Sequence, residues 1–363
     1  MGVKGTHSFL KRNGFRPDVL SSPHIEDSKK IHVDLLGSYY QMIVNSFLKN
    51  EGLIAAEKII TALGTYGLTS ICHLYRLGLT TKLVLGTMFT KDHTTLYLDG
   101  KTTKEKETTA KLRRQVKEKD LKKMEDLLRK AEEKAKSGKR VSGTQISDIH
   151  RLCRRAFSLT PNMKTALAEA ALASGWTIIE CIGEADVHIG GLTLTDEDVV
   201  VSGDSDMLFY DSVQHVLRPM AKMVYHYYSK TDITTLLNLT SLQWTSVGIV
   251  SGNDYDPNIW GYGIARNCQI IRSISGTTVA GIVKKYLTKI EPKCSNTFDT
   301  AIKIFVTQQQ EMADLQIEVQ ETTWKSLNFR FNTMQKLARD YRKASRKSES
   351  YKALICHEYQ HSY

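Results

Sequence analysis

The sequence is poor in the residues that mark several common classes of protein. Its 363 residues include six prolines and six cysteines, and no two cysteines form a Cys-x-x-Cys pair. Scattered thiols argue against a disulfide framework or a zinc site and are typical of a reduced, intracellular protein. No apolar run reaches about 18 residues, so we expect no membrane-spanning helix. The first residues lack the apolar core of a secretory signal, and they lack the Arg- and Ser-rich composition of a transit peptide.

Positive charge is in excess, and it is concentrated in two segments. Lys and Arg number 50 against 39 Asp and Glu, giving a net charge of +11. Residues 101–140 carry 16 basic and 8 acidic side chains, and residues 335–363 carry seven and three. The excess predicts a polyanionic partner, either nucleic acid or an anionic membrane surface. The stretch 104–136 is also compatible with a solvated helix that carries i,i+4 ion pairs.

Short β-type runs alternate with helical stretches before residue 230. Strands are predicted for residues 30–34, 94–98, 176–180 and 199–201. Helices are predicted for residues 38–48, 53–77, 104–136, 145–157 and 161–174, and the chain from about residue 230 onward is predicted to be mostly helical. This alternation predicts an α/β fold with a largely parallel sheet.

Each of the four predicted strands is followed by acidic side chains. They are Asp34, Asp99, the pair Glu184 and Asp186, and the pair Asp204 and Asp206. Because a parallel α/β sheet places its site beyond the carboxyl ends of its strands, we expect these acids at one edge. One such acid is usually a helix N-cap, but six together repel one another and need compensating cations. Hard oxygen ligands suit Mg²⁺ or Mn²⁺, so the simplest chemistry is two-metal phosphoryl chemistry.

A seventh acid, Asp254, precedes Gly261 and Gly263 between two predicted helices. Glycines between helices let backbone amides approach a phosphate closely. Helix–loop–helix elements with glycines are also common as purely structural units, so this segment alone decides nothing.

Together these motifs resemble the flap endonuclease (XPG-type) superfamily of structure-specific 5′ nucleases, over roughly residues 1–290 and in the family's order. The segments that carry the resemblance are Met1–Gly5, Val33-Asp34 with Ser38–Gln41, Leu98–Lys101, Gly183–Asp186, Ser202–Asp206 and Gly252–Tyr255 followed by Gly261–Gly263. The fold that the resemblance implies is α/β and PIN-like (Rossmann-like), a mostly parallel sheet flanked by helices with a helical arch and a helix–two-turn–helix element.

The resemblance also implies a division of the chain into five parts. They are an N-terminal nuclease region (1–100), a basic helical arch or cap (101–143), an internal nuclease region (144–230), a helix–two-turn–helix duplex-binding region (231–290) and a helical, basic C-terminal extension (291–363).

The activity implied by the resemblance is that of a metal-dependent 5′ nuclease. It would hydrolyse DNA phosphodiesters at 5′ flaps or 5′ ends by a two-metal mechanism and leave a 5′-phosphate and a 3′-hydroxyl. One metal ion would be held by Asp34, Asp99, Glu184 and Asp186, and the second by Asp204, Asp206 and Asp254. The expected cofactors are two Mg²⁺ ions, for which Mn²⁺ can substitute, and a K⁺ ion at the helix–two-turn–helix element.

Further roles follow from the same resemblance. Lys106 and Arg113 lie about two helical turns apart, hence on one helix face, and would stabilise charge on the scissile phosphate. The residues expected at nucleic acid are Gly2 near the active site, Tyr40 as a base-stacking aromatic, and Gly261, Gly263 and Arg266 on duplex backbone. Ordinary solvated charges at Lys106 and Arg113, and a core tyrosine at position 40, are the alternatives.

The expected partner is DNA with a 5′ flap or 5′ end and adjoining duplex, with RNA as a second possibility and no membrane. We expect an intracellular, nuclear location, with an organelle as the alternative. Departures from the family's pattern are Gly203 in place of an acid, Ile264-Ala265 in place of Pro-Lys, and the absence of a sliding-clamp peptide. They leave open a junction-resolving or RNA-directed nuclease of the same fold, and a catalytically silent nucleic-acid-binding scaffold.

Overall fold

The structure is a computed structural model, and its described part falls into two compact units. It describes residues 2–20, 30–40, 92–101, 103–136, 142–156, 158–159, 176–220, 224–290 and 296–307, with Lys164, Ala168 and Ala171. The first unit draws on residues 1–40, 79–107 and 176–320, and the second on residues 41–78, 108–175 and 321–363.

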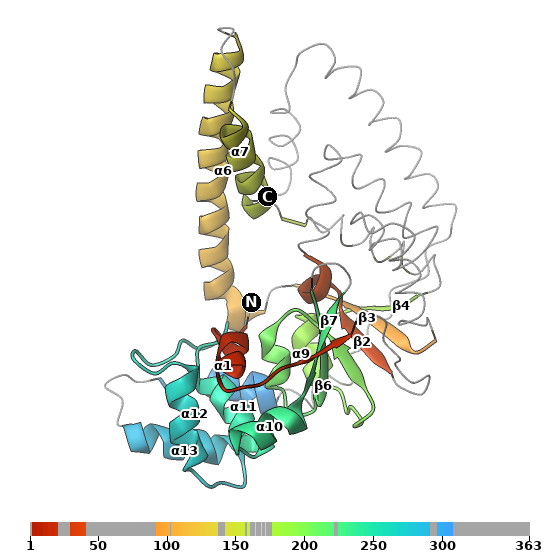
Figure 1. Ribbon diagram of the computed structural model, residues 1–363, viewed down its shortest axis with the longest axis vertical. Helices are drawn as coiled ribbons and strands as arrows, with labels where there is room; N and C mark the ends of the chain where they lie inside the picture. The colour runs from red at the N-terminus through yellow and green to blue at the C-terminus, as the bar shows by residue number, and fades with distance from the viewer. Residues whose placement is uncertain are drawn as a thin grey trace. The chain divides into compact units, whose positions relative to one another are not determined.

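The first unit is built on one mixed sheet of seven strands, ordered β1-β7-β6-β5-β2-β3-β4 (Figure 1). The strands are β1 (Asp18–Leu20), β2 (Ile31–Asp34), β3 (Thr94–Leu98), β4 (Thr177–Glu180), β5 (Val199–Val201), β6 (His215–Pro219) and β7 (Tyr225–Ser229). Neighbours from β6 across to β4 pair in parallel, whereas β7 runs antiparallel to β6 and β1 antiparallel to β7. The predicted α/β class with a mostly parallel sheet is therefore confirmed.

The central strands explain where a site can form. Every residue of β2 and β5 is buried, as expected for parallel strands inside a covered sheet. Strand β2 pairs with β3 on one side and with β5 on the other, where Val33 lies opposite Val201. The chain leaves β2 toward β3 and leaves β5 toward β6, in opposite directions. The carboxyl ends of β2 and β5 therefore flank a switch point, where open α/β sheets bind their ligands.

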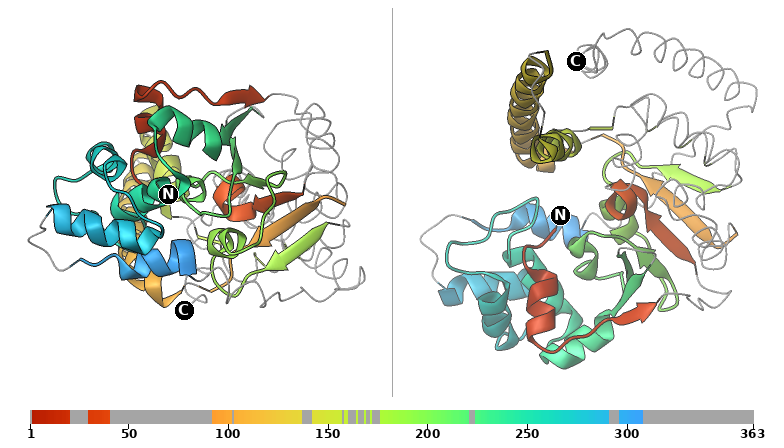
Figure 2. Two further views of the ribbon diagram at one scale, coloured as in Figure 1. Left: turned by 90° about the horizontal axis from the view of Figure 1, so that it is seen from below. Right: turned by 45° about the horizontal axis from the view of Figure 1, so that its top comes forward.

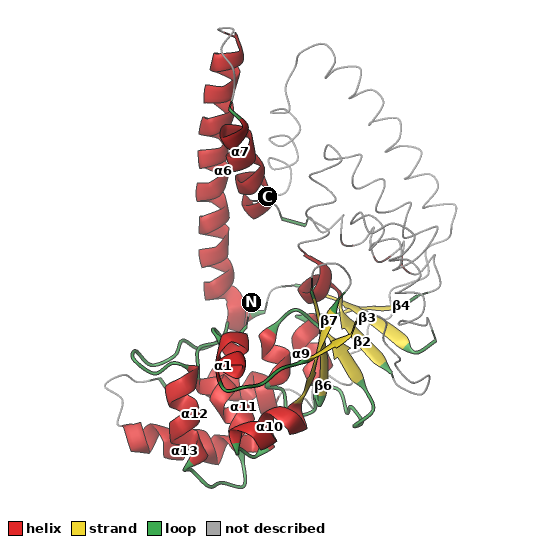
Figure 3. Ribbon diagram, in the orientation of Figure 1, coloured by secondary structure: helices red, strands yellow, loops and turns green. Residues whose placement is uncertain are grey.

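Apart from the helical stretch 35–40 that follows β2, the described helices of the same unit gather on one side of the sheet (Figure 3). They are α1 (Thr6–Arg12), α9 (Ala185–Gly190), α10 (Lys230–Leu237), α11 (Ser241–Val250), α12 (Ile264–Arg272) and α13 (Val279–Ile290), followed by α14 (Asp299–Ile302) and a π-helical turn, Lys303–Thr307. Helices α11, α12 and α13 pack on one another, as the two views in Figure 2 show.

Local sequence signals fix the ends of two of these helices. The Ser229 hydroxyl accepts the N–H of Asp232 at the start of α10. Thr240 and Gln243 form a reciprocal capping box at the start of α11. The indole of Trp244 is buried and donates to the carbonyl of Leu208 at 2.8 Å, which ties α11 to the turn after β5.

The second unit contains two described helices, α6 (Glu107–Lys136) and α7 (Gly143–Ala156). Arg155 pairs with Asp120 at 3.0 Å, and the Gln145 amide donates to the Leu127 carbonyl at 3.2 Å, so the helices run antiparallel. Met124 of α6 is buried although the helix is highly charged. The long charged helix is as predicted. No helix in the described ranges combines the length and apolar character needed to cross a bilayer.

The sequence predicted the strands on one side of the sheet, β2 to β5, and missed those on the other side. All four predicted strands are present, but β1, β6 and β7 were not expected. Strand β7 (Tyr225–Ser229) is only partly buried and rich in tyrosine, so it lacks an apolar run such as that of β5. Residues 53–77 and 335–363, and most of 38–48 and 161–174, lie outside the described residues, so those predictions stay predictions.

Candidate metal centre

All seven predicted acids belong to the first unit, and most of them follow strands of the sheet. Asp34 ends β2, Asp99 follows β3, and Asp204 and Asp206 follow β5. Glu184 and Asp186 stand at the start of α9, directly after β4, and Asp254 follows α11. The topology thus brings to one edge carboxylates that are far apart in the sequence.

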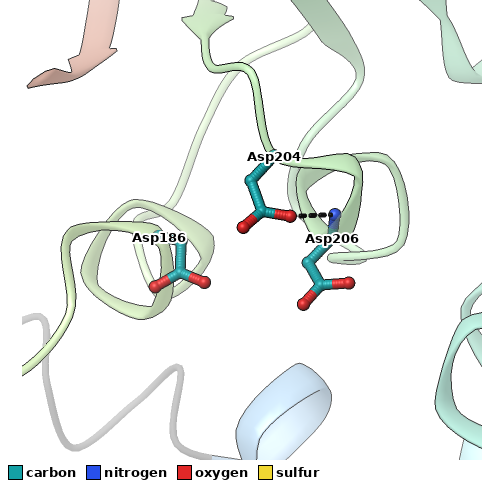
Figure 4. A group of neighbouring side chains, drawn as sticks. All are labelled: Asp186, Asp204 and Asp206. Carbon is teal, nitrogen blue, oxygen red and sulfur yellow. Dashed lines mark hydrogen bonds between the residues drawn. The ribbon is translucent and has the colours of Figure 1, made fainter. Parts of the chain in front are cut away.

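The tightest group consists of Asp186, Asp204 and Asp206. Each offers one carboxylate oxygen, and the three oxygens lie within 4.8 Å of one another. Figure 4 shows Asp186 reaching from α9 toward the two aspartates of the turn Ser205–Leu208. Oδ1 of Asp204 accepts the backbone N–H of Asp206 at 3.1 Å, which fixes the spacing of these two side chains.

The burial and the mutual repulsion of these three carboxylates indicate that a bound cation would stabilise them. Asp206 is fully buried, and its Oδ2 has no hydrogen-bond partner among the described residues. Burial, with Asp204 and Asp186 nearby, raises its pKa well above the usual value. Burial and the Asp186 carboxylate raise the pKa of Asp204 to about 6. An orphaned buried oxygen within an all-oxygen donor set fits a hard divalent cation.

Asp34 is held in place by two donors. Its Oδ1 accepts the N–H of Gly37, and its Oδ2 accepts the Ser202 hydroxyl, both at 2.8 Å. Burial, together with Asp99 and Asp186, raises its pKa. The Ser202 oxygen also accepts the N–H of Asp204 at 3.0 Å, so it links the ends of β2 and β5. No role is predicted for Ser202 from the sequence, and its position two residues before Asp204 was the available signal.

Asp99 connects the end of β3 to α9. Its Oδ1 accepts the N–H of Ala185 at 2.7 Å, at the first residue of that helix. Glu184 and Asp186 flank this contact, so Asp99 sets the place of both. The Asp99 charge also contributes to the raised pKa of Asp34 and, after burial and Asp186, to that of Glu184.

Lys106 supplies a positive charge inside this cluster. It closes the 3-10 turn Lys104–Lys106, is 7% exposed, and forms an ion pair with Glu184. Its ammonium also lies 3.8 Å from Asp186 and from Asp254. Burial opposes its charge, but these carboxylates outweigh burial and raise the pKa of Lys106. Of the predicted basic pair, Lys106 therefore lies at the acids.

Tyr255 is a member of the site that sequence reasoning missed. Its hydroxyl donates to Glu184 at 3.2 Å, and the Lys106 ammonium lies 4.8 Å from the centre of its ring. The ring also meets Phe305 edge-on. Tyr255 thus positions both partners of the ion pair. Its place directly after Asp254 was the signal that could have found it.

The N-terminal segment closes one side of the trio. Gly2 has a φ of 84°, and a Cβ there would overlap Oδ1 of Asp204. The next N–H, that of Val3, donates to Oδ1 of Asp206 at 2.7 Å. Gly2 therefore lies at the carboxylates, as expected from the resemblance, while its contact with nucleic acid stays a prediction.

The predicted phosphate-contacting turn lies between α11 and α12. Gly261 has a φ of 83°, and Gly263 precedes the first residue of α12. The Arg266 guanidinium stacks over the Tyr262 ring at 4.1 Å and donates to the Gly261 carbonyl at 3.4 Å. The helix–loop–helix geometry is as predicted; binding to duplex by these residues stays a prediction.

Two further predicted residues lie elsewhere. Arg113 belongs to α6 in the second unit, so its part in catalysis stays a prediction. Tyr40 ends the described helical stretch 35–40 and is half-buried, and burial raises its pKa. One departure from the family's pattern has a structural reason, because a Cβ at Gly203 would lie 2.6 Å from the Gly37 carbonyl oxygen. An acidic side chain at position 203 would therefore require the backbone to shift.

No protein-family model matches the chain. Exonuclease 1 of Xenopus laevis is 23% identical over 292 residues, covering 78% of this chain and 35% of the relative. Flap endonuclease 1 of Methanocaldococcus jannaschii is 27% identical over 217 residues, covering 57% of this chain and 62% of the relative. The chain is thus similar to proteins named exonuclease 1 and flap endonuclease 1. It spans less than two thirds of the length of each of these curated relatives.

Solved structures of similar proteins agree only loosely with this one. Flap endonuclease-1 from Methanococcus jannaschii gives a TM-score of 0.47 at 17% identity, over 94% of this chain and 100% of that one. The catalytic core of Rad2 in complex with a DNA substrate gives 0.46 at 16% identity, over 89% of each chain.

Proposed function

We propose that this protein is a metal-dependent, structure-specific 5′ nuclease that hydrolyses DNA phosphodiesters at 5′ flaps or 5′ ends by a two-metal mechanism. The observation that carries the proposal is the convergence of Asp186, Asp204 and Asp206, whose oxygens lie within 4.8 Å of one another. The similarity to proteins named exonuclease 1 and flap endonuclease 1 supports it.

The proposed metal ligands form the two groups that the resemblance implies. Asp34, Asp99, Glu184 and Asp186 would hold one Mg²⁺ or its waters, and Asp204, Asp206 and Asp254 the second, with Mn²⁺ as a substitute. Bound there, such ions supply Lewis-acid activation of water and offset negative charge on the phosphate. The all-oxygen donor set, together with the Oδ2 of Asp206, which has no hydrogen-bond partner in the part of the chain that the structure describes, supports this assignment over a thiol or imidazole site.

Residues of the chain itself would prepare the site. Lys106 offsets part of the negative charge and would contact the scissile phosphate as a charge-assisted donor. Tyr255 keeps the Lys106 ammonium and the Glu184 carboxylate in place through its ring and hydroxyl. Arg113 would provide a second cation to the phosphate, and Tyr40 would stack on a base beside the scissile bond.

The proposed substrate is DNA whose duplex adjoins a free 5′ end. The net charge of +11 favours a polyanion, and the turn from Gly261 to Arg266 offers backbone amides and a guanidinium for duplex phosphates, with a K⁺ ion as an expected aid. We propose a nuclear or organellar location on the same grounds, because such DNA is found there.

A panel of labelled substrates tests the proposal. It contains a 5′ flap, a nicked duplex, a four-way junction and the matching RNA, each incubated with Mg²⁺, Mn²⁺ or EDTA. We expect the 5′ flap and the 5′ end at the nick of the nicked duplex to be cut in either metal and neither to be cut in EDTA. Cutting in EDTA contradicts the metal mechanism, and no cutting of any substrate in either metal contradicts the nuclease proposal and leaves a nucleic-acid-binding scaffold as the alternative.

One observation concerns a second candidate function, a nuclease of the same fold that acts on junctions or on RNA. Ile264 is buried in the first turn of α12, where the family's pattern has Pro-Lys at positions 264 and 265. This turn therefore presents one cation fewer to duplex phosphates than the family's pattern does, so a junction-resolving or RNA-directed nuclease of the same fold stays the alternative. In the panel, preferential cutting of the junction or of the RNA would select that alternative.

A further inference from the structure

Trp260 is the most exposed large hydrophobic side chain among the described residues. It is 95% exposed, whereas Trp176 and Trp244 are buried. Hydrophobic side chains scattered singly on a surface are ordinary, but an indole with almost all of its surface in water loses most of the stabilisation that its size offers. Neither packing in the core nor the proposed metal centre accounts for a tryptophan at this position.

The backbone around Trp260 is well fixed. The preceding side chain, Ile259, is buried, and its carbonyl accepts the N–H of Tyr262 at 3.0 Å. The carbonyl of Tyr262 accepts in turn from the Asn258 amide at 3.1 Å and from the Asn267 amide at 3.2 Å. Trp260 therefore belongs to a turn whose backbone is held by hydrogen bonds, between the buried Ile259 and Gly261, which has a positive φ.

The neighbours of Trp260 are suited to a polyanion. Helix α12 has no acidic residue in its first turn, and Gly263 before it provides no side-chain cap. Arg266 lies in that turn with its guanidinium over the Tyr262 ring. A cationic, glycine-bounded turn next to an exposed indole combines phosphate contacts with an aromatic face, as proteins that bind single-stranded nucleic acid do.

The same surroundings disfavour a protein partner. The other exposed large hydrophobic side chains that the structure describes belong to other elements: Val19, Leu112, Val116, Ile182, Met220 and Leu236. Within its own turn Trp260 is therefore the single exposed large hydrophobic side chain that the structure describes, whereas protein interfaces surround their hot-spot aromatics with further contacts that exclude water. A single flat indole matches one nucleobase instead.

We propose that Trp260 stacks on an exposed nucleobase of bound DNA, beside backbone phosphates that contact the turn from Gly261 to Arg266. The proposal rests on the proposed nuclease function, because it takes the ligand of this turn to be DNA. It adds a base-stacking position that is distinct from the metal centre and insensitive to base identity. Bases are exposed at flaps, gaps and single strands, so Trp260 would favour DNA that carries such features over continuous duplex.

Tryptophan fluorescence tests the stacking directly. The signal of Trp260 is the difference between the wild type and Trp260→Phe, and it is recorded with Ca²⁺ in place of Mg²⁺ to limit cutting. We expect a single-stranded oligonucleotide and a 5′-flap DNA to quench this signal, because stacked bases quench an indole. Heparin, a polyanion without bases, should bind without quenching it.

Binding measurements with matched variants complete the test. Trp260→Ala should weaken the affinity for flap DNA about tenfold, whereas Trp260→Phe, which keeps a ring, should lose less than threefold. Leu236→Ala is the control, because Leu236 is also an exposed hydrophobic residue, 47% exposed, and lies on α10. It should bind like the wild type. Thermal melts check that each variant is folded.

Each result bears on the inference separately from the nuclease proposal. If the wild type binds and cuts flap DNA while Trp260→Ala binds equally well and no quenching is seen, the stacking inference is wrong and the nuclease stands. If the signal is quenched but nothing is cut, the stacking inference stands and the nuclease proposal is wrong. Self-association that disappears in Trp260→Ala, seen by sedimentation, would assign the indole to a protein contact and overturn the inference.

Discussion

Tyr255 donates its hydroxyl to the Glu184 carboxylate at 3.2 Å, and the same carboxylate forms an ion pair with Lys106. The Lys106 ammonium lies over the Tyr255 ring, so each of the side chains of Tyr255, Glu184 and Lys106 contacts the other two. Burial and the nearby Asp186 raise the pKa of Glu184 to about 7, while Lys106 opposes that rise. The charge state of Glu184 is therefore set by its neighbours.

Replacing Tyr255 with phenylalanine should slow cutting and weaken the fold. The variant keeps the ring but leaves Glu184 without one donor, which should lower the free energy of unfolding by about 1 to 2 kcal/mol. Denaturant titration and single-turnover cutting measure the two effects. Tyr227→Phe is the control, because it removes the hydrogen bond of the Tyr227 hydroxyl in β7 with the His215 ring in β6, at 2.8 Å. If both variants cut equally slowly, Tyr255 has no special role.

Lys106→Met should separate metal binding from catalysis. Removing the ammonium leaves the acids with more net negative charge, so the affinity for Mn²⁺ should rise. Cutting should fall at the same time, because a cation at the phosphate is lost. Isothermal titration and flap cleavage report the two quantities. A variant that loses both metal affinity and cutting would show that Lys106 serves mainly to hold the fold together.

Asp204→Asn should abolish cutting while binding of flap DNA persists. The change preserves size and removes one of the three charges that lie within 4.8 Å of one another. Gel-shift and cleavage assays measure the two properties side by side. Asp196→Asn, at an exposed position, should behave as the wild type does. Loss of DNA binding in Asp204→Asn would contradict a role confined to the metal centre.

Gly2→Ala and Gly5→Ala form a matched pair. Both glycines have positive φ, at 84° and 81°, so both substitutions should cost about 1 to 2 kcal/mol of stability. Only at Gly2 would the new Cβ overlap Oδ1 of Asp204; at Gly5 nothing lies within 4 Å. We therefore expect Gly2→Ala to lose metal affinity and cut at least tenfold more slowly, with Gly5→Ala unaffected in both. Equal cutting by the two variants would contradict the packing of Gly2 against the metal centre.

The metal-free protein should lose stability as the pH rises from about 4 to about 7. The pKa of Glu184 is raised from 4.5 to about 7, and that of Asp204 from 3.8 to about 6, in both cases by burial first and Asp186 second. The folded form then binds more protons than the unfolded chain, so this stability is complete below about pH 4 and falls as the pH passes the folded values.

Melting temperatures across this range, in EDTA and in Mg²⁺, measure that effect. Saturating Mg²⁺ should flatten the pH dependence, because bound cations replace the protons as the opposing charge. Glu184→Gln combined with Asp204→Asn should flatten it without metal. A pH dependence that is the same in EDTA and in Mg²⁺ would show that other groups cause it.

The sequence was sufficient for strands β2 to β5 and for the acids because both signals are local. The three valines of β5 and the apolar residues of β2 mark buried parallel strands, and the acids after them mark the sheet edge. Strands β6 and β7 each have a neighbour on both sides in the sheet, but they were missed because both are only partly buried and neither contains a continuous apolar run. Tyr255 and Ser202 were missed for another reason, since hydroxyl groups gain a role only from the carboxylate that they meet.

By itself, the sequence determined the class of fold, the acids at the strand ends and the similarity to flap endonuclease/XPG-type nucleases. Only the tertiary structure decided that Asp186, Asp204 and Asp206 are the closest three, that Lys106 lies among the acids, and that Trp260 is exposed. The reason is physical. Hydrophobic periodicity and charge patterns are recorded along the chain, whereas distances between side chains depend on how strands distant in sequence pair in one sheet.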